Sequence, residues 1–234
     1  MSVSYHPLVN KVLTRFRLQS SSFVRPTDPV KPFVTIAREP GSGGAPIAKA
    51  VAEKLGFEFV DDQIIDEIAK STKKRKAIIQ AVDEKSRSNI EDVIHSILNS
   101  EYITDESYIS ELIRVTLSYA HSGYCVILGR GANFITPFAK GLHVNISAPY
   151  DVRVGRAMDF EGLKKPAAKK LIAAVEKDRA EFVRQYFNHD ISKKNAYDIT
   201  INTQYFKVDE ARDVIIEALY RKFSKSLPYS FVRK

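Results

Sequence analysis

The sequence has no tryptophan, a single cysteine and no long hydrophobic run. Cys125 therefore has no second thiol in the chain for a disulfide or for a cysteine metal cluster. It stands in the apolar run 124–128, which is typical of a buried structural thiol and fits a reducing compartment. No stretch approaches the roughly 20 apolar residues that span a bilayer. These absences argue against a disulfide scaffold or a membrane-spanning protein, and they favour a cytoplasmic one.

The overall composition is that of a folded globular protein. Hydrophobic residues make up 44% of the 234 residues and charged residues 27%, so a disordered chain is not expected. The length suits one α/β domain with an insertion, or two small domains. The net charge of +8 indicates an anionic partner. Nucleotide phosphates, nucleic acid and anionic lipid all qualify, so charge alone does not choose between them.

Residues 1–32 differ from the rest and are taken as a basic extension and linker. One interpretation is an organelle transit peptide, which is amphipathic, basic and poor in acidic residues. The other is a short helix that packs on the domain or on a second copy, which leaves a homodimer open. We favour the packed helix, with organelle targeting as the open alternative. Among the first thirty residues the basic ones are Lys11, Arg15, Arg17 and Arg25, against one acidic residue, Asp28.

Apolar runs and helical stripes alternate from residue 33 onward. Short β-branched runs between glycines and turns predict strands, and apolar residues three and four apart predict helices. This alternation predicts an α/β fold: a doubly wound, parallel, five-stranded sheet with helices on both faces. The basic block 73–76 is interpreted as a solvated turn in a largely helical region from 66 to 120. The expected strands are 33–37, 57–60, 124–128, 142–147 and 198–202, and the other expected helices are 47–55, 151–163, 166–187 and 208–223.

A glycine-rich segment lies between the first strand and the first helix. Gly41, Gly43 and Gly44 predict a loop whose backbone N–H groups turn toward a phosphate, with a helix N-terminus behind them. A tight turn without a ligand is the alternative. Gly44 stands where a Walker-type loop has its lysine, and Ala45 and Pro46 follow where hydroxyl residues belong. Charge stabilisation in any catalysis must therefore come mainly from arginines.

Three downstream arginines fit that requirement. Arg153 and Arg156 are three residues apart on one expected helix, so they share a face. Arg179 falls on the apolar stripe of the helix 166–187, where an arginine is costly without a partner. It points either into a functional cleft or into a buried ion pair with Glu176 or Asp178, and periodicity does not separate the two.

Five ordered blocks together resemble the cytidylate kinase-like family, over about residues 34 to 220. Relatives of this kind have a Gly-Ser-Gly-Gly loop without the lysine, and they usually place Arg-Glu where this chain has Ala45 and Pro46. The blocks are 38–44 (REPGSGG), 126–134 (VILGRGANF), 148–149 followed by Arg153 and Arg156, 178–184 (DRAEFVR) and 197–203 (YDITINT).

The resemblance implies a P-loop kinase fold with helical insertions in one domain, 33–225, followed by a tail, 226–234. The acceptor region is expected at about 63–122 and a mobile lid at about 158–195. The implied activity is an ATP- and Mg²⁺-dependent (d)CMP-type kinase, with a nucleoside triphosphate and a nucleoside monophosphate as partners. The implied donor-site residues are Arg38, Gly41, Ser42, Gly43 and Gly44. The implied acceptor residues are Asp61, Arg87 and Arg130, with Asp61 also near Mg²⁺, and the implied catalytic residues are Arg130, Arg153, Arg156, Arg179 and Arg184.

Two further functions stay open. Ala45 and Pro46 motivate a catalytically weak or dead nucleotide-binding protein that acts through partners. The charge of +8 and the basic extension motivate a nucleic-acid or membrane-surface binder. That third reading ranks last, because tryptophan is absent, no nucleic-acid module is present and a phosphate site explains much of the positive charge.

Overall fold

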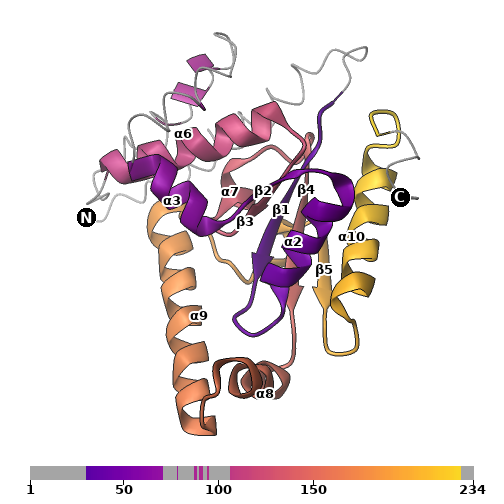
Figure 1. Ribbon diagram of the computed structural model, residues 1–234. Coiled ribbons are helices and arrows are strands. Elements are labelled where there is room, and N and C mark those ends of the chain that lie inside the picture. The colour runs from indigo at the N-terminus through magenta and orange to yellow at the C-terminus, as the bar shows by residue number, and fades with distance from the viewer. Residues whose placement is uncertain are drawn as a thin grey trace.

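The computed structural model describes residues 30–70 and 106–227, and between them positions 78, 87, 88, 90, 91 and 94. The basic block 73–76, most of the extension 1–32 and most of the tail 226–234 lie outside these residues, so the predictions made for them are not tested. Figure 1 shows the arrangement of the described elements. In chain order these are β1 (Phe33–Arg38), α2 (Gly44–Leu55), β2 (Glu58–Val60), α3 (Asp62–Lys70), α6 (Glu106–Ser122), β3 (Cys125–Leu128), α7 (Ala132–Ile135), β4 (Gly141–Ser147), α8 (Tyr150–Glu161), α9 (Lys165–Phe187), a 3₁₀ turn (Lys194–Ala196), β5 (Ile199–Asn202) and α10 (Val208–Lys222).

The five strands form one parallel sheet in the order β2-β3-β1-β4-β5. β1 lies at the centre, where Val34 pairs with Val126 of β3 on one side and with Leu142 of β4 on the other. The predicted doubly wound five-stranded sheet is therefore confirmed. The expected strand and helix bounds differ from the observed ones by a few residues at most within the described ranges.

Helices cover both faces of the sheet. Val34 and Ile36 of β1 pack in one hydrophobic cluster with residues of α2 and α10. Phe33 of β1 and Ile127 of β3 pack in a second cluster with α6, α7 and the end of α9. Successive side chains of a strand point to opposite faces, so the two clusters lie on opposite sides of the sheet. In Figure 1, α2 and α10 stand on one side of the strands and α6 and α9 on the other.

Helix α2 follows directly from its sequence. Ile47, Val51 and Leu55 recur at helical spacing and are all buried. The helix ends at Gly56, which adopts a left-handed conformation with φ 67° and donates its N–H to the carbonyls of Ala52 and Glu53. This glycine cap is the usual way in which a helix stops before a strand.

Helices α8 and α9 extend beyond the carboxyl ends of the strands (Figure 1). Val154 of α8 and Ile172 of α9 share a small hydrophobic cluster of their own. Farther along α9, Val183 and Phe187 belong to the core on the sheet. One continuous helix, which makes up most of the segment 158–195, thus packs both on the sheet and on α8, and the mobility expected for that segment stays a prediction. Within residues 30–70 and 106–227, no helix combines the length and the apolar character that crossing a membrane requires.

Two left-handed glycines give a matched test of this packing. Gly131 has φ 64°, and a Cβ there would lie 2.3 Å from Cε2 of Phe187, whereas Gly56 has φ 67° with nothing within 4 Å. Gly56→Ala is expected to lower the free energy of unfolding by about 1–2 kcal/mol, the cost of the left-handed backbone. Gly131→Ala adds overpacking of about 1–3 kcal/mol. Urea unfolding measures both, and equal losses would contradict the contact with Phe187.

Candidate phosphate-binding site

The sheet topology creates a crevice between β1 and β3. These strands are neighbours, but the chain leaves β1 for α2 on one face and leaves β3 for α7 on the other. In open α/β sheets, ligands bind outside the carboxyl ends of the strands at such a switch point. A cavity of about 240 Å³ lies there. Its lining includes Arg38, Asp62, Arg130, Asp178, Arg179 and Phe182.

Two of the cavity arginines are paired with carboxylates. Nη2 of Arg38 donates to Oδ2 of Asp62 at 2.7 Å. Burial acts to raise the pKa of Asp62, but the charge and the hydrogen bond of Arg38 outweigh it and hold that pKa below its ordinary value. Arg130 donates from Nε to Oδ1 of Asp66 at 2.8 Å and from Nη2 to Oδ2, a bidentate pair. Tyr108 also donates to Asp66, at 2.7 Å, and so helps to fix this carboxylate.

Arg130 is held in an unusual backbone conformation. Its φ is 49°, between Gly129 and Gly131, which also have positive φ. A non-glycine residue in this region costs roughly 1–3 kcal/mol and is common at binding sites. The ion pair with Asp66 and the ring of Phe182, 5.7 Å from the guanidinium carbon, hold the side chain in place. The backbone between β3 and α7 therefore presents this guanidinium to the cavity at a conformational cost.

Arg179 differs from the other two cavity arginines because it has no carboxylate partner among the described residues. Its Nη1 donates to the backbone oxygen of Arg38 at 2.8 Å. Burial, and then the charges of Arg38 and Arg130, lower the pKa of Arg179 to about 10. Glu176, one of its two expected partners, pairs with Arg153 instead. Asp178, the other, lines the cavity but forms no ion pair with Arg179 in the described ranges. The cleft interpretation of Arg179 is therefore the one the structure favours.

The glycine loop connects β1 to α2 beside this cavity. Gly41 and Gly43 have φ 78° and 81°, and α2 begins at Gly44 with no side chain capping its N-terminus. Ser42 is fully buried, and its hydroxyl donates to the carbonyl of Glu39 at 2.7 Å, so it turns inward. The loop thus leaves backbone N–H groups at the start of α2 available to an anion. A Cβ at Gly43 would meet nothing closer than Nη1 of Arg156 at 3.9 Å, so no side chain crowds the loop at this residue.

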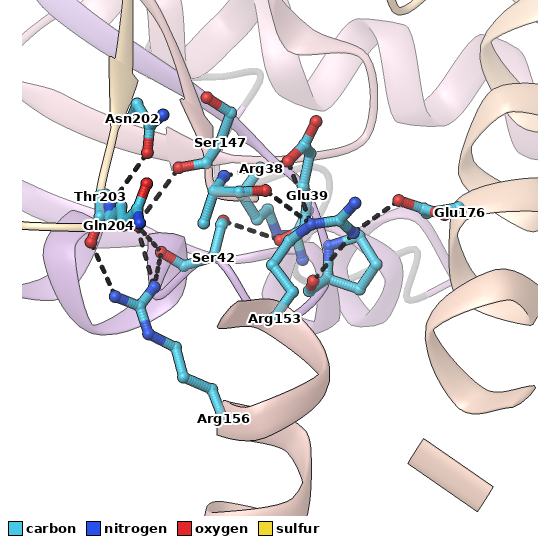
Figure 2. A network of polar contacts seen from close by, with 12 residues as sticks. Arg38, Glu39, Ser42, Ser147, Arg153, Arg156, Glu176, Asn202, Thr203 and Gln204 are labelled. Atoms are coloured by element: carbon cyan, nitrogen blue, oxygen red, sulfur yellow. Dashed lines mark hydrogen bonds and ion pairs between the residues drawn. The ribbon is translucent and has the colours of Figure 1, made fainter. Parts of the chain in front are cut away.

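Arg153 and Arg156 of α8 reach toward the loop (Figure 2). Arg153 is 7% exposed and pairs with Glu176 at 2.5 Å and with Glu39 at 3.3 Å. Arg156 donates from Nη1 to the carbonyl of Ser42 at 3.2 Å and from Nη2 to the carbonyl of Thr203 at 2.7 Å. They share a helix face as expected, and protein acceptors engage both guanidinium groups. Their expected catalytic role stays a prediction.

The remaining sequence-predicted residues lie apart from this group. Arg184 and Arg87 are exposed, and neither lines the cavity. Asp61 does not line the cavity, whereas its neighbour Asp62 does. The roles expected for these three stay predictions. Sequence reasoning did not single out Asp62 or Asp66. The signal for Asp66 was its place four residues after Asp62, which puts both carboxylates on one face of a helix that begins at a strand end.

No three His, Cys, Asp or Glu side chains group as a metal site in the part of the chain that is described. Mg²⁺ in nucleotide enzymes is held by one or two carboxylates together with the phosphates, so it does not need such a group. Asp62 in the cavity is a carboxylate of the required kind beside a loop that suits phosphates. The residues present therefore fit a nucleotide-borne Mg²⁺.

The comparison with known sequences decides the family. A sequence model of the cytidylate kinase-like family matches residues 33–205, more than half of the chain. This chain belongs to the cytidylate kinase-like family. A cytidylate kinase of Sulfolobus acidocaldarius is 23% identical over 190 residues, covering 81% of this chain and 94% of that protein. A cytidylate kinase of Desulfurococcus amylolyticus is 29% identical over 185 residues, covering 78% and 89%.

A solved structure supports the fold. An uncharacterized protein from Eubacterium ventriosum superposes with a TM-score of 0.63 at 22% identity, over 82% of this chain and 99% of that one. The similarity noted from the sequence blocks is thereby confirmed at the level of family and fold.

Stability measurements on Arg179 and Arg130 test the charge balance of the cavity. Arg179→Met removes a cation that has no carboxylate partner and is expected to raise the free energy of unfolding by about 1 kcal/mol. Arg130→Met leaves Asp66 without its partner and is expected to lower it by about 1–3 kcal/mol. Both variants should lose the stabilisation that added inorganic pyrophosphate gives to the unmodified protein. Urea unfolding with and without pyrophosphate measures this, and a destabilised Arg179→Met would contradict the assignment.

Proposed function

We propose that the protein is a nucleoside monophosphate kinase that transfers the γ-phosphoryl group of ATP to CMP or a related monophosphate. The observation that carries the proposal is Arg179, a cation that faces Arg38 and Arg130 in the switch-point cavity without a carboxylate of its own. A phosphate dianion would supply the missing negative charge. Membership of the cytidylate kinase-like family supports a nucleotide as the carrier of that phosphate.

The two halves of the site would take the two substrates. The acceptor phosphate would bind in the cavity against Arg130, whose planar guanidinium suits bidentate contact with phosphate oxygens. The donor phosphates would bind at the loop 41–44 and the start of α2, where backbone N–H groups and the helix dipole favour anions. Mg²⁺, bound with the nucleotide, would neutralise charge on the donor phosphates, and Asp62 is the carboxylate placed to contact its hydration shell.

The chemistry needs no protein nucleophile. An oxygen of the acceptor phosphate attacks the γ-phosphorus of ATP, the bond from that phosphorus to the bridging oxygen breaks, and ADP leaves. The contribution of the chain is to position both substrates and to stabilise the charge on the transferred group. Arg130 and Arg179 converge on the same cavity and are the side chains best placed to do so. Arg38 is held by Asp62 and sets the field in which they act.

A coupled assay for ADP tests this proposal. We expect Mg²⁺-dependent ADP formation that rises when CMP, dCMP or UMP is added. Arg179→Met is expected to reduce kcat/KM by about 10³-fold or more, as removal of an arginine from a phosphoryl-transfer site does. Lys177→Met, at an exposed cation on the same helix, serves as the matched comparison and should have a much smaller effect. No acceptor-stimulated turnover with any common monophosphate would remove the proposal.

The start of α2 favours a second candidate, a nucleotide-binding protein with weak or no turnover. Ala45 and Pro46 are exposed at the open end of this helix. Neither has a polar side chain, and Pro46 has no N–H to donate. A donor nucleotide would then meet backbone N–H groups but no charged side chain from this turn. The protein would bind nucleotide and act through partners.

Substitution at these two positions separates the candidates. Since both side chains are exposed, Ala45→Arg with Pro46→Glu is expected to fold normally and to raise turnover about tenfold or more if the turn limits catalysis. Pro46→Glu alone is the control, because it restores an N–H without adding positive charge. An inert double variant that still binds ATP, measured by calorimetry, would contradict this explanation of weak turnover.

A further inference from the structure

Four carbonyl groups at the phosphate loop, between residues 38 and 42, are held by hydrogen bonds that do not belong to the helix or sheet pattern. Ser42 caps the carbonyl of Glu39 through both its N–H and its hydroxyl. The other three accept from arginine side chains: Arg38 from Arg179, Pro40 from Arg153 and Ser42 from Arg156.

Two N–H groups at the end of the same loop are available to a ligand. The N–H groups of Gly43 and Gly44 have no acceptor among the described residues, and no side chain caps the helix that they open. A peptide unit directs its N–H and C=O in opposite directions. The Ser42 carbonyl shares its peptide unit with the Gly43 N–H, and the Pro40 carbonyl shares its unit with the Gly41 N–H, so fixing these two carbonyls also fixes the directions of those two N–H groups.

The contacts that hold the loop form two groups, and Arg153 makes the first of them (Figure 2). Its Nε donates to the carbonyl of Ala148 at 2.9 Å, and its Nη1 lies 3.4 Å from the carbonyl of Pro40. The carboxylates of Glu39 and Glu176 neutralise it. The fit is close, because a Cβ at Gly41 would lie 2.7 Å from the backbone oxygen of Arg153. This arginine has acceptors from the loop, from the end of β4 and from α9.

Arg156 and Thr203 form the second group. Nη1 of Arg156 donates to the hydroxyl of Thr203 at 3.0 Å, and that hydroxyl lies 2.7 Å from the carbonyl of Ser42 and 3.2 Å from that of Ser147. Thr203 is 1% exposed. A buried hydroxyl with an arginine donor on one side and the loop carbonyl on the other tethers the loop to the ends of β4 and β5. Figure 2 shows these contacts on the far side of Ser42 from Arg153.

We propose that Arg153 and Arg156 are positioning residues for the phosphate loop, with Thr203 and Glu39 as their partners, and that they do not themselves bind the transferred phosphate. The proposal rests on the proposed function only for the identity of the anion. Each guanidinium donates to one loop carbonyl and to neighbouring protein acceptors, so the loop can offer its N–H groups without a lysine. Freeing either arginine for a nucleotide would release a carbonyl that it now holds.

Thr203 gives the sharpest test, since it acts on the loop only through the hydroxyl. Thr203→Val keeps the shape and removes that hydroxyl, and Thr203→Ser restores it. Amide hydrogen exchange of the peptide spanning residues 38–47 should be about tenfold faster in Thr203→Val than in the unmodified protein, and near normal in Thr203→Ser. The KM for ATP should rise about tenfold with kcat within about threefold, and the KM for the acceptor should stay unchanged.

A double-mutant cycle completes the test. Arg156→Gln should reproduce the loop exchange and the ATP effect of Thr203→Val, and the combined variant should be little worse than either alone, because both break one tether. Glu39→Gln, at a side chain 39% exposed, tests the Arg153 tether in the same way and serves if Thr203→Val does not fold. Loss of kcat by Arg156→Gln with unchanged loop exchange would overturn the proposal, because it would make the arginine a direct phosphate ligand.

The outcome does not depend on turnover. Loop exchange and the binding of ATP or inorganic pyrophosphate, measured by calorimetry, are read without an acceptor. A protein that binds ATP and shows the predicted exchange differences but transfers no phosphate would contradict the proposed function and leave the tether confirmed. Normal turnover with identical loop exchange in Thr203→Val and Thr203→Ser would support the proposed function and contradict the tether.

Discussion

Uncompensated positive charge at the carboxyl ends of β1 and β3 is the constraint on which this site depends. Three guanidinium groups converge on one cavity, and Asp62 and Asp66 neutralise two of them. The third, Arg179, forms no ion pair within the described residues and donates to a backbone carbonyl, and burial together with the charges of Arg38 and Arg130 lowers its pKa to about 10. A cation in this position weakens the empty protein and strengthens its complex with an anion. The site thus lowers the stability of the empty protein and raises its affinity for the anion, as functional sites commonly do.

The phosphate loop also depends on arginine, but for a different purpose. A loop without a lysine must rely on backbone N–H groups, whose directions are only as fixed as the peptide planes that carry them. Arg153 and Arg156 contact the carbonyl groups of the loop, whereas the lysine of a Walker-type loop would contact the phosphates. Arginine suits this task because its five donors reach several acceptors in one plane. On the proposed assignment, one set of arginines faces the ligand and another shapes the surface that the ligand meets.

The sequence alone was sufficient for the sheet and for part of the site. β-branched runs that end in glycine located the strands, and Arg179 was marked because an arginine interrupts an apolar stripe. The sequence could not identify Asp62 rather than Asp61 as the carboxylate that lines the cavity. Adjacent residues at the start of a helix point in different directions, and only the packing of α3 determines which one faces the cavity. The tether at Thr203 could not be predicted from the sequence either, because its hydroxyl contacts a carbonyl 161 positions earlier in the chain. No local spacing encodes such a contact.

Helix α9 gives these local arrangements a mechanical connection. Its final turns are anchored in the core by Val183 and Phe187, and farther toward its N-terminus it carries Arg179 into the cavity and Glu176 to Arg153. The two residues are three positions apart and lie on one face of the helix. A movement of α9 relative to the sheet would therefore displace both contacts together. The cavity and the support of the phosphate loop thus depend on the position of a single helix.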